Sequence, residues 1–418
     1  MFQEPQLFNS HIEMGPAPAS LTVSGGPAEY TASFTPNDTY FRDQWNFSAM
    51  GMPTAWDYNR GGSSQVRVAV VDSGLYPVSD FRQDLIDWKN SWDFVYNDPY
   101  PYDYNGHGTH VAGTIAQATD NSRGVAGIAY NSTLLPLRVL DSLGGGSNAN
   151  VVAAIDYAVA HRVDVINLSL GSSTYFPSLE AAINRAYQAG VLVVAAAGNQ
   201  GKAGLAFPAA FSTVLAVGAV GRSGELPSFS NHARDMVLAP GVDIWQQSDW
   251  GWYVAASGTS MATPHVSALA ALVIAEAQEE GAAMPAKGPA RVDWIKNIII
   301  NSCQDLGAPG QDSTYGWGMA RADWALASLQ PAAAPAETPA EETKAPAQPR
   351  RGYDPGDGSF SPAGLSPALD ATLAHLLAGA PLPAGTGAAW LAAPGQGGAS
   401  LAQGLAGFHT GEAPLAAA

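Results

Sequence analysis

The sequence predicts an α/β fold in which a mostly parallel sheet is covered by helices on both faces. Short apolar runs such as residues 66–71 are rich in β-branched side chains and lack polar alternation, which is typical of strands buried on both faces. Longer stretches of helical character separate these runs. Because strands that alternate with helices form parallel sheets, both observations indicate the same layered architecture.

The apolar runs and the helical stretches follow one another in a regular order. We expect strands at 66–71, 134–140, 163–168, 191–196 and 214–220, and helices at 111–117, 148–160, 178–188 and 262–279. Pro264 falls in the first turn of the last helix, where its missing N–H is harmless. In such sheets the site lies at the carboxyl ends of the strands, so polar residues there are candidates for chemistry.

Composition divides the 418-residue chain into three parts. Residues 1–34 are rich in Pro, Gly, Ser and Thr without periodicity, so we interpret them as a loose leader or the remnant of a prosegment. Residues 35–329 carry the periodic segments and are expected to form one domain. Residues 330–418 are an Ala/Pro/Gly-rich linker and tail, for which we predict disorder with one short helix at 366–378.

Charge and cysteine content exclude several classes of protein. The formal net charge of −17 argues against nucleic acid and anionic membranes as partners, because both require basic patches. Cys303 is the single cysteine, so no disulfide can form within the chain. The first residues lack the basic start and apolar stretch of a signal peptide, and no run is long and apolar enough to predict a membrane span.

Four polar residues interrupt the predicted elements in a way that suits acyl transfer. Asp72 ends a strand, His107 opens a helix between two glycines, and Ser260 stands at a helix N-terminus. Ser260 can attack a carbonyl carbon while His107 takes its proton and Asp72 orients the imidazole. Asn199 follows another strand and can donate to the oxyanion. Taken singly, Ser260 is equally well explained as a helix cap, and Asp72 and Asn199 as turn residues.

Three motifs carry the triad candidates: Val-Val-Asp-Ser-Gly at 70–74, Asn-Gly-His-Gly-Thr-His at 105–110 and Gly-Thr-Ser-Met-Ala-Thr-Pro-His at 258–265. Together, over about residues 35–329, they resemble the subtilase family of subtilisin-like serine proteases, within it the thermitase-like branch. The order Asp, His, Ser is that of the family. The resemblance implies a three-layer subtilisin-like fold. It also implies a secreted endopeptidase of broad specificity that forms an acyl-enzyme on Ser260 and prefers an apolar or aromatic P1 residue, the residue whose carbonyl is attacked.

The resemblance also implies how a peptide binds. Residues 169–171 match a strand that pairs with the substrate backbone, and residues 144–146 match the segment on its other side. For residues 144–146 the alternative is a flexible surface loop. Pro208 matches a turn in which a cis peptide is expected. The implied substrate-binding residues are Ser169, Leu170, Gly171, Gly144, Gly145, Gly146, Ala196 and Gly198.

The segment 119–125 resembles the calcium loop of the family. The implied ligands are Asp38 and Asp84 through carboxylates, Asn121 through its side chain, and Thr119, Arg123 and Val125 through backbone carbonyls. Such oxygens suit a hard cation of calcium's size. Asp93 and Asp98 are candidates for a weaker second site, although Tyr96 stands where the thermitase-like pattern has an aspartate. The alternative is a polar turn with unrelated surface carboxylates.

Two other functions are found on the same fold and must be weighed against hydrolysis. A pseudoprotease that only binds peptides would lack a triad or oxyanion residue, and all four are present. A peptide ligase or macrocyclase must keep water from the acyl-enzyme, and no sizeable insertion lies between the motifs. We therefore expect a monomeric peptidase whose partners are protein or peptide substrates.

Overall fold

The structure of this protein is a computed structural model that describes residues 33–331. Its main sheet has nine strands: β1 (Arg67–Asp72), β2 (Trp92–Asp93), β3 (Thr133–Arg138), β4 (Val165–Leu168), β5 (Leu192–Ala196), β6 (Leu215–Val220), β7 (Val237–Pro240), β10 (Cys303–Gln304) and β11 (Met319–Ala320). The strand order is β10-β11-β7-β6-β5-β4-β1-β3-β2, and every neighbouring pair is parallel except β10 with β11. A separate antiparallel pair consists of β8 (Ile244–Gln247) and β9 (Tyr253–Ala256).

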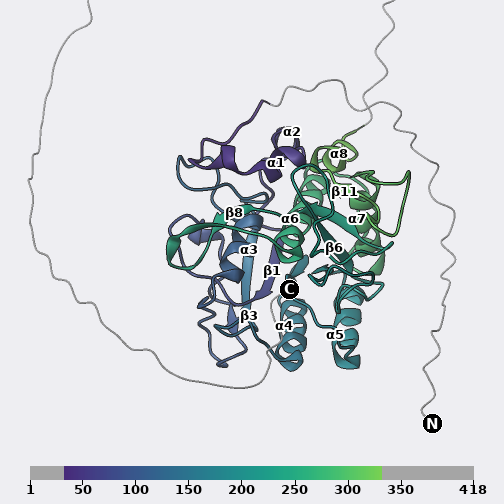
Figure 1. The fold of residues 1–418 in the computed structure, drawn as a ribbon. Coiled ribbons are helices and arrows are strands. Elements are labelled where there is room, and N and C mark those ends of the chain that lie inside the picture. The colour runs from purple at the N-terminus through teal and green to yellow at the C-terminus, as the bar shows by residue number, and fades with distance from the viewer. Residues whose placement is uncertain (1–32, 332–418) are drawn as a thin grey trace, which may run out of the picture. The chain divides into compact units, whose positions relative to one another are not determined.

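Helices cover the sheet on both faces (Figure 1). Along the chain they are α1 (Trp45–Ala49), α2 (Met52–Tyr58), α3 (His107–Ala116), α4 (Asn148–Ala160), α5 (Pro177–Gln188), α6 (Thr259–Glu279), α7 (Pro289–Asn301) and α8 (Ala322–Ala327). Three short 3₁₀ helices are η1 (Phe41–Asp43), η2 (Gln83–Leu85) and η3 (Asp249–Gly251). One face packs against α4 and α5, and the other against α3, α6 and α7. The predicted three-layer α/β fold is confirmed.

Strand β1 shows why the strand segments lack polar alternation. Val68 and Val70 belong to the core cluster that contains α3 and α6, whereas Ala69 and Val71 belong to the cluster that contains α4 and α5. Both faces of the strand are therefore buried, and an apolar side chain is favoured at every position.

Every expected strand and helix within residues 33–331 is present, with bounds shifted by a few residues. Helix α3 begins at His107 rather than at 111, and α6 begins at Thr259 rather than at 262, so that Pro264 lies inside α6. Proline has no N–H to give to the carbonyl four residues earlier, which is that of Ser260. The hydroxyl of Ser169 donates to this carbonyl at 2.9 Å instead. The proline thus leaves an acceptor that joins the second residue of α6 to the segment after β4.

Among the described helices, α6 alone is long and apolar enough to cross a membrane, but its apolar window is wholly buried inside the protein. It is the central core helix of the layer that contains α3 and α7 (Figure 1). Almost all of the predicted leader (1–34) and tail (330–418), with the helix expected at 366–378, falls outside the described residues.

Candidate active site

The end of β1 and the start of α3 bring Asp72 and His107 together. Nδ1 of His107 donates to Oδ1 of Asp72 at 2.7 Å, and the same oxygen accepts the N–H of Ser73 at 2.7 Å. Asp72 is fully buried, and the His107 side chain is 14% exposed. Because the Nδ1 proton faces the carboxylate, Nε2 is the unprotonated nitrogen, and it has no hydrogen-bond partner among residues 33–331. His107 is therefore arranged as a proton acceptor.

Electrostatics distinguish His107 from the two histidines near it. Burial by itself lowers the pKa of His107, but the charge and hydrogen bond of Asp72, with the charge of Asp103, outweigh burial and raise the pKa above 6.5. Burial lowers the pKa of both His110 and His265 to about 4, so these two stay neutral near pH 7. His107 is the most basic imidazole of the three.

Ser260 reaches the same edge of the sheet from α6. It is the second residue of that helix and is 1% exposed. Its hydroxyl donates to the carbonyl oxygen of Ser169 at 3.0 Å. Ser169 follows β4, and β4 is the parallel neighbour of β1, which ends at Asp72. Ser260 is thus held next to the end of the strand beside the one that carries Asp72. The position at a helix N-terminus favours negative charge beside the serine, as an attack on a carbonyl creates.

Asn199 is oriented by Thr259, the residue before the serine. Its Oδ1 accepts both the N–H and the hydroxyl of Thr259 at 2.9 Å. An N–H can only donate, so the oxygen of the amide must face Thr259 and Nδ2 must point the other way. Asn199 is partly exposed. The structure therefore presents an amide donor beside Ser260, as an oxyanion hole requires.

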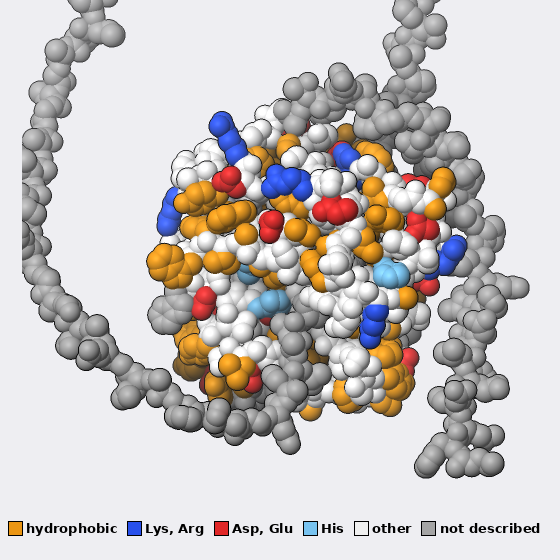
Figure 2. Space-filling view, viewed as in Figure 1, with side chains coloured by type: hydrophobic (Ala, Val, Ile, Leu, Met, Phe, Trp, Pro, Cys, Tyr) orange, Lys and Arg blue, Asp and Glu red, His pale blue; other side chains and the backbone are white. Residues whose placement is uncertain are grey.

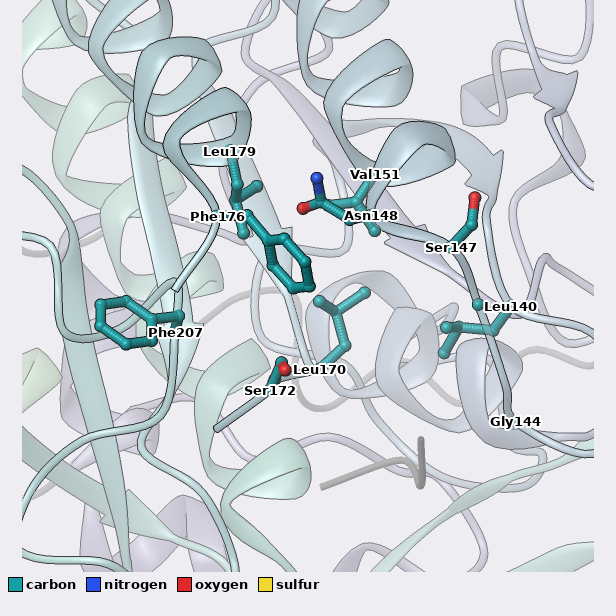
Figure 3. Close-up of a pocket in the computed structure, with 12 residues that line it drawn as sticks. Leu140, Gly144, Ser147, Asn148, Val151, Leu170, Ser172, Phe176, Leu179 and Phe207 are labelled. Carbon is teal, nitrogen blue, oxygen red and sulfur yellow. The ribbon is translucent and has the colours of Figure 1, made fainter. Parts of the chain in front are cut away.

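The two segments expected to flank a peptide line one apolar pocket (Figure 3). Gly144 and Gly146 border it on one side, and Leu170 and Gly171 on the other. The side chains of Phe176 and Leu170 turn toward the same hollow in Figure 3. The remaining lining residues are Leu140, Ser147, Asn148, Val151, Ser172, Leu179 and Phe207.

Two other implied substrate residues, Ala196 and Gly198, come just before Asn199 in the chain. Ala196 is the buried last residue of β5, and Gly198 has a φ of +108° immediately before Asn199. Ser172 pairs with Phe207 in an antiparallel bridge. The peptide bond between Phe207 and Pro208 is cis, as expected.

The loop at residues 119–125, which resembles a calcium loop, contacts the N-terminal arm. Oδ2 of Asp38 accepts the N–H of Asp120 at 2.8 Å, whereas Oδ1 is buried with no partner in the described part of the chain. Side chains of Asn121 and Asp80 meet at 2.7 Å. Burial raises the pKa of both Asp38 and Asp80, and the charge of Asp80 raises that of Asp38 further. Two buried carboxylates that oppose each other's charge are a setting that a cation would stabilise.

Backbone geometry supports the same fit. Gly124 has a φ of +50°, and a Cβ there would collide with Asp80 and Tyr253. The glycine thus lets the loop backbone pass close to the Asp80 carboxylate, whose Oδ2 accepts the Tyr253 hydroxyl at 3.1 Å. No group of three or more His, Cys, Asp or Glu side chains that fits a metal occurs among residues 33–331, so amide and carbonyl oxygens would complete this site. Thr119, Arg123 and Val125 lie in the loop; the Arg123 guanidinium binds Ser79, and Val125 is buried.

Asp84 does not join this group. Its carboxylate is exposed and pairs with Arg82 at 2.7 Å, and the pair lowers the pKa of Asp84. Asp80, four residues earlier, is fully buried and occupies the place that the sequence analysis assigned to Asp84. Both aspartates follow the first strand within one loop, so chain order alone does not decide between them. Asp80 precedes the apolar Phe81, which is buried, and this neighbour indicates that Asp80 is the buried aspartate of the two.

Asp93 and Asp98 do not fit a second calcium ion. Oδ2 of Asp93 pairs with Nη1 of Arg138 at 2.8 Å, and both side chains are fully buried. Oδ1 of Asp93 accepts the backbone N–H groups of Val95 and Tyr96. A fixed cation, the Arg138 guanidinium, therefore already neutralises this carboxylate. The rings of Tyr96 and Tyr104 cover the guanidinium at 4.8 and 5.1 Å from its central carbon.

Charged side chains do not cluster by sign on the face of the molecule shown in Figure 2. On the face shown in Figure 2, acidic and basic groups are interspersed among apolar and uncharged ones. The surface there has neither the basic stripe of a nucleic-acid site nor a strong acidic field.

Residues 63–318 match the model of the subtilase family. A protease structure from Pseudoalteromonas arctica PAMC 21717 superposes with a TM-score of 0.62 at 31% identity, covering 71% of this chain and 100% of that one.

Two relatives carry thermophilic names. A thermophilic serine proteinase of Bacillus sp. (strain AK1) is 43% identical over 251 residues, which are 59% of this chain and 61% of that protein. Thermitase of Thermoactinomyces vulgaris is 40% identical over 246 residues, 58% of this chain and 86% of thermitase. This chain thus spans about three fifths of the length of the first of these relatives. With the family match, the site geometry and these identities, the chain belongs to the subtilase family of serine endopeptidases.

Proposed function

We propose that this chain hydrolyses peptide bonds through an acyl-enzyme on Ser260. The observation that carries the proposal is the Asp72–His107 pair, set at the sheet edge that also holds Ser260 and the oriented amide of Asn199. Nε2 of His107 takes the proton of Ser260 as its Oγ bonds to the carbonyl carbon. The oxyanion accepts a hydrogen bond from Nδ2 of Asn199, and His107 then returns the proton to the leaving amine. Water repeats the cycle and releases the acid.

We propose further that specificity is broad, with an apolar or aromatic P1 residue. The segments expected to wall the P1 site are small and uncharged, so a basic side chain would find no ionic partner there. The apolar pocket between 144–146 and 170–172 would take a second apolar side chain of the same extended peptide.

Calcium, monomeric state and location complete the proposal. Calcium would be held by Asp38, Asp80, Asn121 and carbonyls of the loop 119–125, and would tie the N-terminal arm to the loop without joining the reaction. We propose a monomer, because one chain supplies the whole triad. We also place the enzyme outside the cell, since a peptidase of broad specificity would attack the proteins of the cell that makes it.

Covalent labelling tests the proposal. The full chain is incubated with a fluorophosphonate probe, and the labelled peptide is mapped by mass spectrometry. The label is expected on Ser260 and nowhere on Ser260→Ala, which should also be inactive on casein. A folded protein that takes no label would favour a peptide-binding pseudoprotease. Predominant aminolysis of an ester substrate by added peptide amines in water would favour a ligase.

A further inference from the structure

Immediately before α3 lies a second buried carboxylate, which the triad does not use. Asp103 is fully buried and accepts five hydrogen bonds. Oδ1 accepts the N–H groups of Asn105 and Gly106 and the hydroxyl of Ser73, each at 2.9 Å. Oδ2 accepts the N–H and the hydroxyl of Thr109 at 2.8 and 2.7 Å. None of the ion pairs in the described part of the chain involves Asp103, so these donors and the helix N-terminus stabilise its charge.

Asp103 organises the first turn of α3, which carries His107. The first N–H groups of a helix have no partner within it. Here the Asp103 carboxylate accepts hydrogen bonds from the N–H groups of Gly106 and Thr109. The hydroxyl of Ser73 donates to Asp103, and its oxygen accepts a hydrogen bond from the N–H of Gly108 at 2.8 Å.

The same network reaches the strand end that carries Asp72. Ser73 is the residue after Asp72, and its hydroxyl links Asp103 to α3. Backbones are packed closely around this link, because a Cβ on Gly108 would collide with the carbonyl of Gly74. Both partners of the Asp72–His107 hydrogen bond are thus held by one carboxylate at the same time. A misplacement of about 1 Å at such a pair can reduce turnover about a hundredfold.

We propose that Asp103 is a positioning residue for the peptidase reaction, which holds His107 against Asp72 through the first turn of α3 and Ser73 and places a second negative charge behind the imidazole. This inference rests on the proposed peptidase activity. It assigns to Asp103 no contact with substrate.

The charged groups around His107 determine its pKa, and therefore the pH at which activity falls. Asp72 and Asp103 are anions that favour the imidazolium and raise the pKa of His107. His110 on the same helix and His265 on α6 are neutral near pH 7. Asp249 on η3 lies beside Gly106, with its Oδ1 bound to the hydroxyl of Ser248. Removal of the Asp103 charge should therefore move the acid limb of activity to lower pH.

The test compares Asp103→Asn and Ser73→Ala with the parent, using the fraction of competent sites titrated by the fluorophosphonate probe to correct every rate. For Asp103→Asn we expect kcat to fall about tenfold or more with KM nearly unchanged, and the acid limb to move to lower pH. For Ser73→Ala, which keeps the Asp103 charge, we expect a smaller fall in kcat with the acid limb in place.

A matched control is Asp312→Asn. Asp312 also accepts three loop N–H groups, from Ala308, Thr314 and Tyr315, but it lies between β10 and β11 at the opposite side of the sheet. This control should change stability without changing corrected kcat.

The outcomes separate this inference from the proposed function. Corrected kcat within twofold of the parent, or an unmoved acid limb in Asp103→Asn, overturns the role of Asp103 while the peptidase stands. If Asp103→Asn does not fold, an unchanged kcat in Ser73→Ala overturns the positioning role. A parent that neither takes the label nor cleaves casein refutes the peptidase itself.

Discussion

Replacing Asp38 with asparagine should remove the effect of calcium on stability and leave the metal-free protein no weaker. The pKa of Asp38 is raised by burial, and Asp80 raises it further. The sign follows directly: a carboxyl group whose pKa is higher in the folded than in the unfolded chain destabilises the fold above its ordinary value of 3.8, where it is ionised. Without metal near pH 7, Asp38→Asn therefore relieves an unfavourable charge while its side-chain oxygen can still accept the N–H of Asp120.

With calcium bound, the parent is expected to be more stable than Asp38→Asn. A ligand present at about 100 times its dissociation constant stabilises the folded state by about 2.7 kcal/mol. For a folded body of about 300 residues, unfolding entropy near 0.6 kcal/mol/K converts this to a rise in Tm of about 4 °C. The parent should gain this amount from calcium and lose it in EDTA, with no gain from magnesium. Asp38→Asn and Asp80→Asn should show no gain.

Thermal unfolding is measured by circular dichroism in the Ser260→Ala background, so that self-digestion does not interfere. Asp84→Asn is the matched control, because Asp84 lies in the same loop as Asp80 but is exposed and paired with Arg82. It should keep the full calcium response. The reasoning fails if Asp84→Asn loses the response, if Asp38→Asn keeps it, or if Asp38→Asn melts lower than the parent in EDTA.

Further predictions concern the reaction. Asn199→Ala should lower kcat by about 10²–10³ with KM almost unchanged, because its hydrogen bond forms mainly in the transition state; an equal change in kcat and KM in steady-state kinetics would remove it from the oxyanion hole. Activity should fall as pH drops through the raised pKa of His107, with a midpoint above 6.5 in the pH profile of kcat/KM; a midpoint below 6.5 contradicts the assigned partners. Peroxide should inactivate the enzyme by forming a polar sulfoxide at Met261, which is 4% exposed next to Ser260, and Met261→Ala should resist; equal inactivation of both would assign the damage elsewhere. A peptide library should show apolar and aromatic P1 residues preferred, and a strict requirement for Lys or Arg would refute the uncharged pocket.

The layered fold was predictable because each buried strand is apolar on both faces and each helix has a length that periodicity reveals. The triad and Asn199 were predictable because each is attached to the end of such an element. The start of α6 was misplaced because Pro264 normally marks the first turn, whereas here the hydroxyl of Ser169 satisfies the carbonyl that the proline leaves unpaired.

Contacts between distant loops were harder to predict. Asp80 is fully buried and the Asp84 side chain is 65% exposed, yet they stand four residues apart in one loop. The role of Asp103 depends on Ser73, thirty residues away, through a hydrogen bond that no local pattern encodes. Likewise the partner of Asp93 is Arg138, on a neighbouring strand.

The buried Arg138 affects how the protein responds to changes in the concentration of free metal ions. A metal ion bound at the surface is lost whenever a chelator, dilution or a drop in its free concentration favours release. A guanidinium belongs to the chain and remains charged at any pH a folded protein meets. The loop that precedes the catalytic histidine is therefore braced by a cation that no chelator can extract, whereas the docking of the N-terminal arm would follow the calcium supply. Scarcity of calcium should then loosen the periphery before it disturbs the catalytic centre.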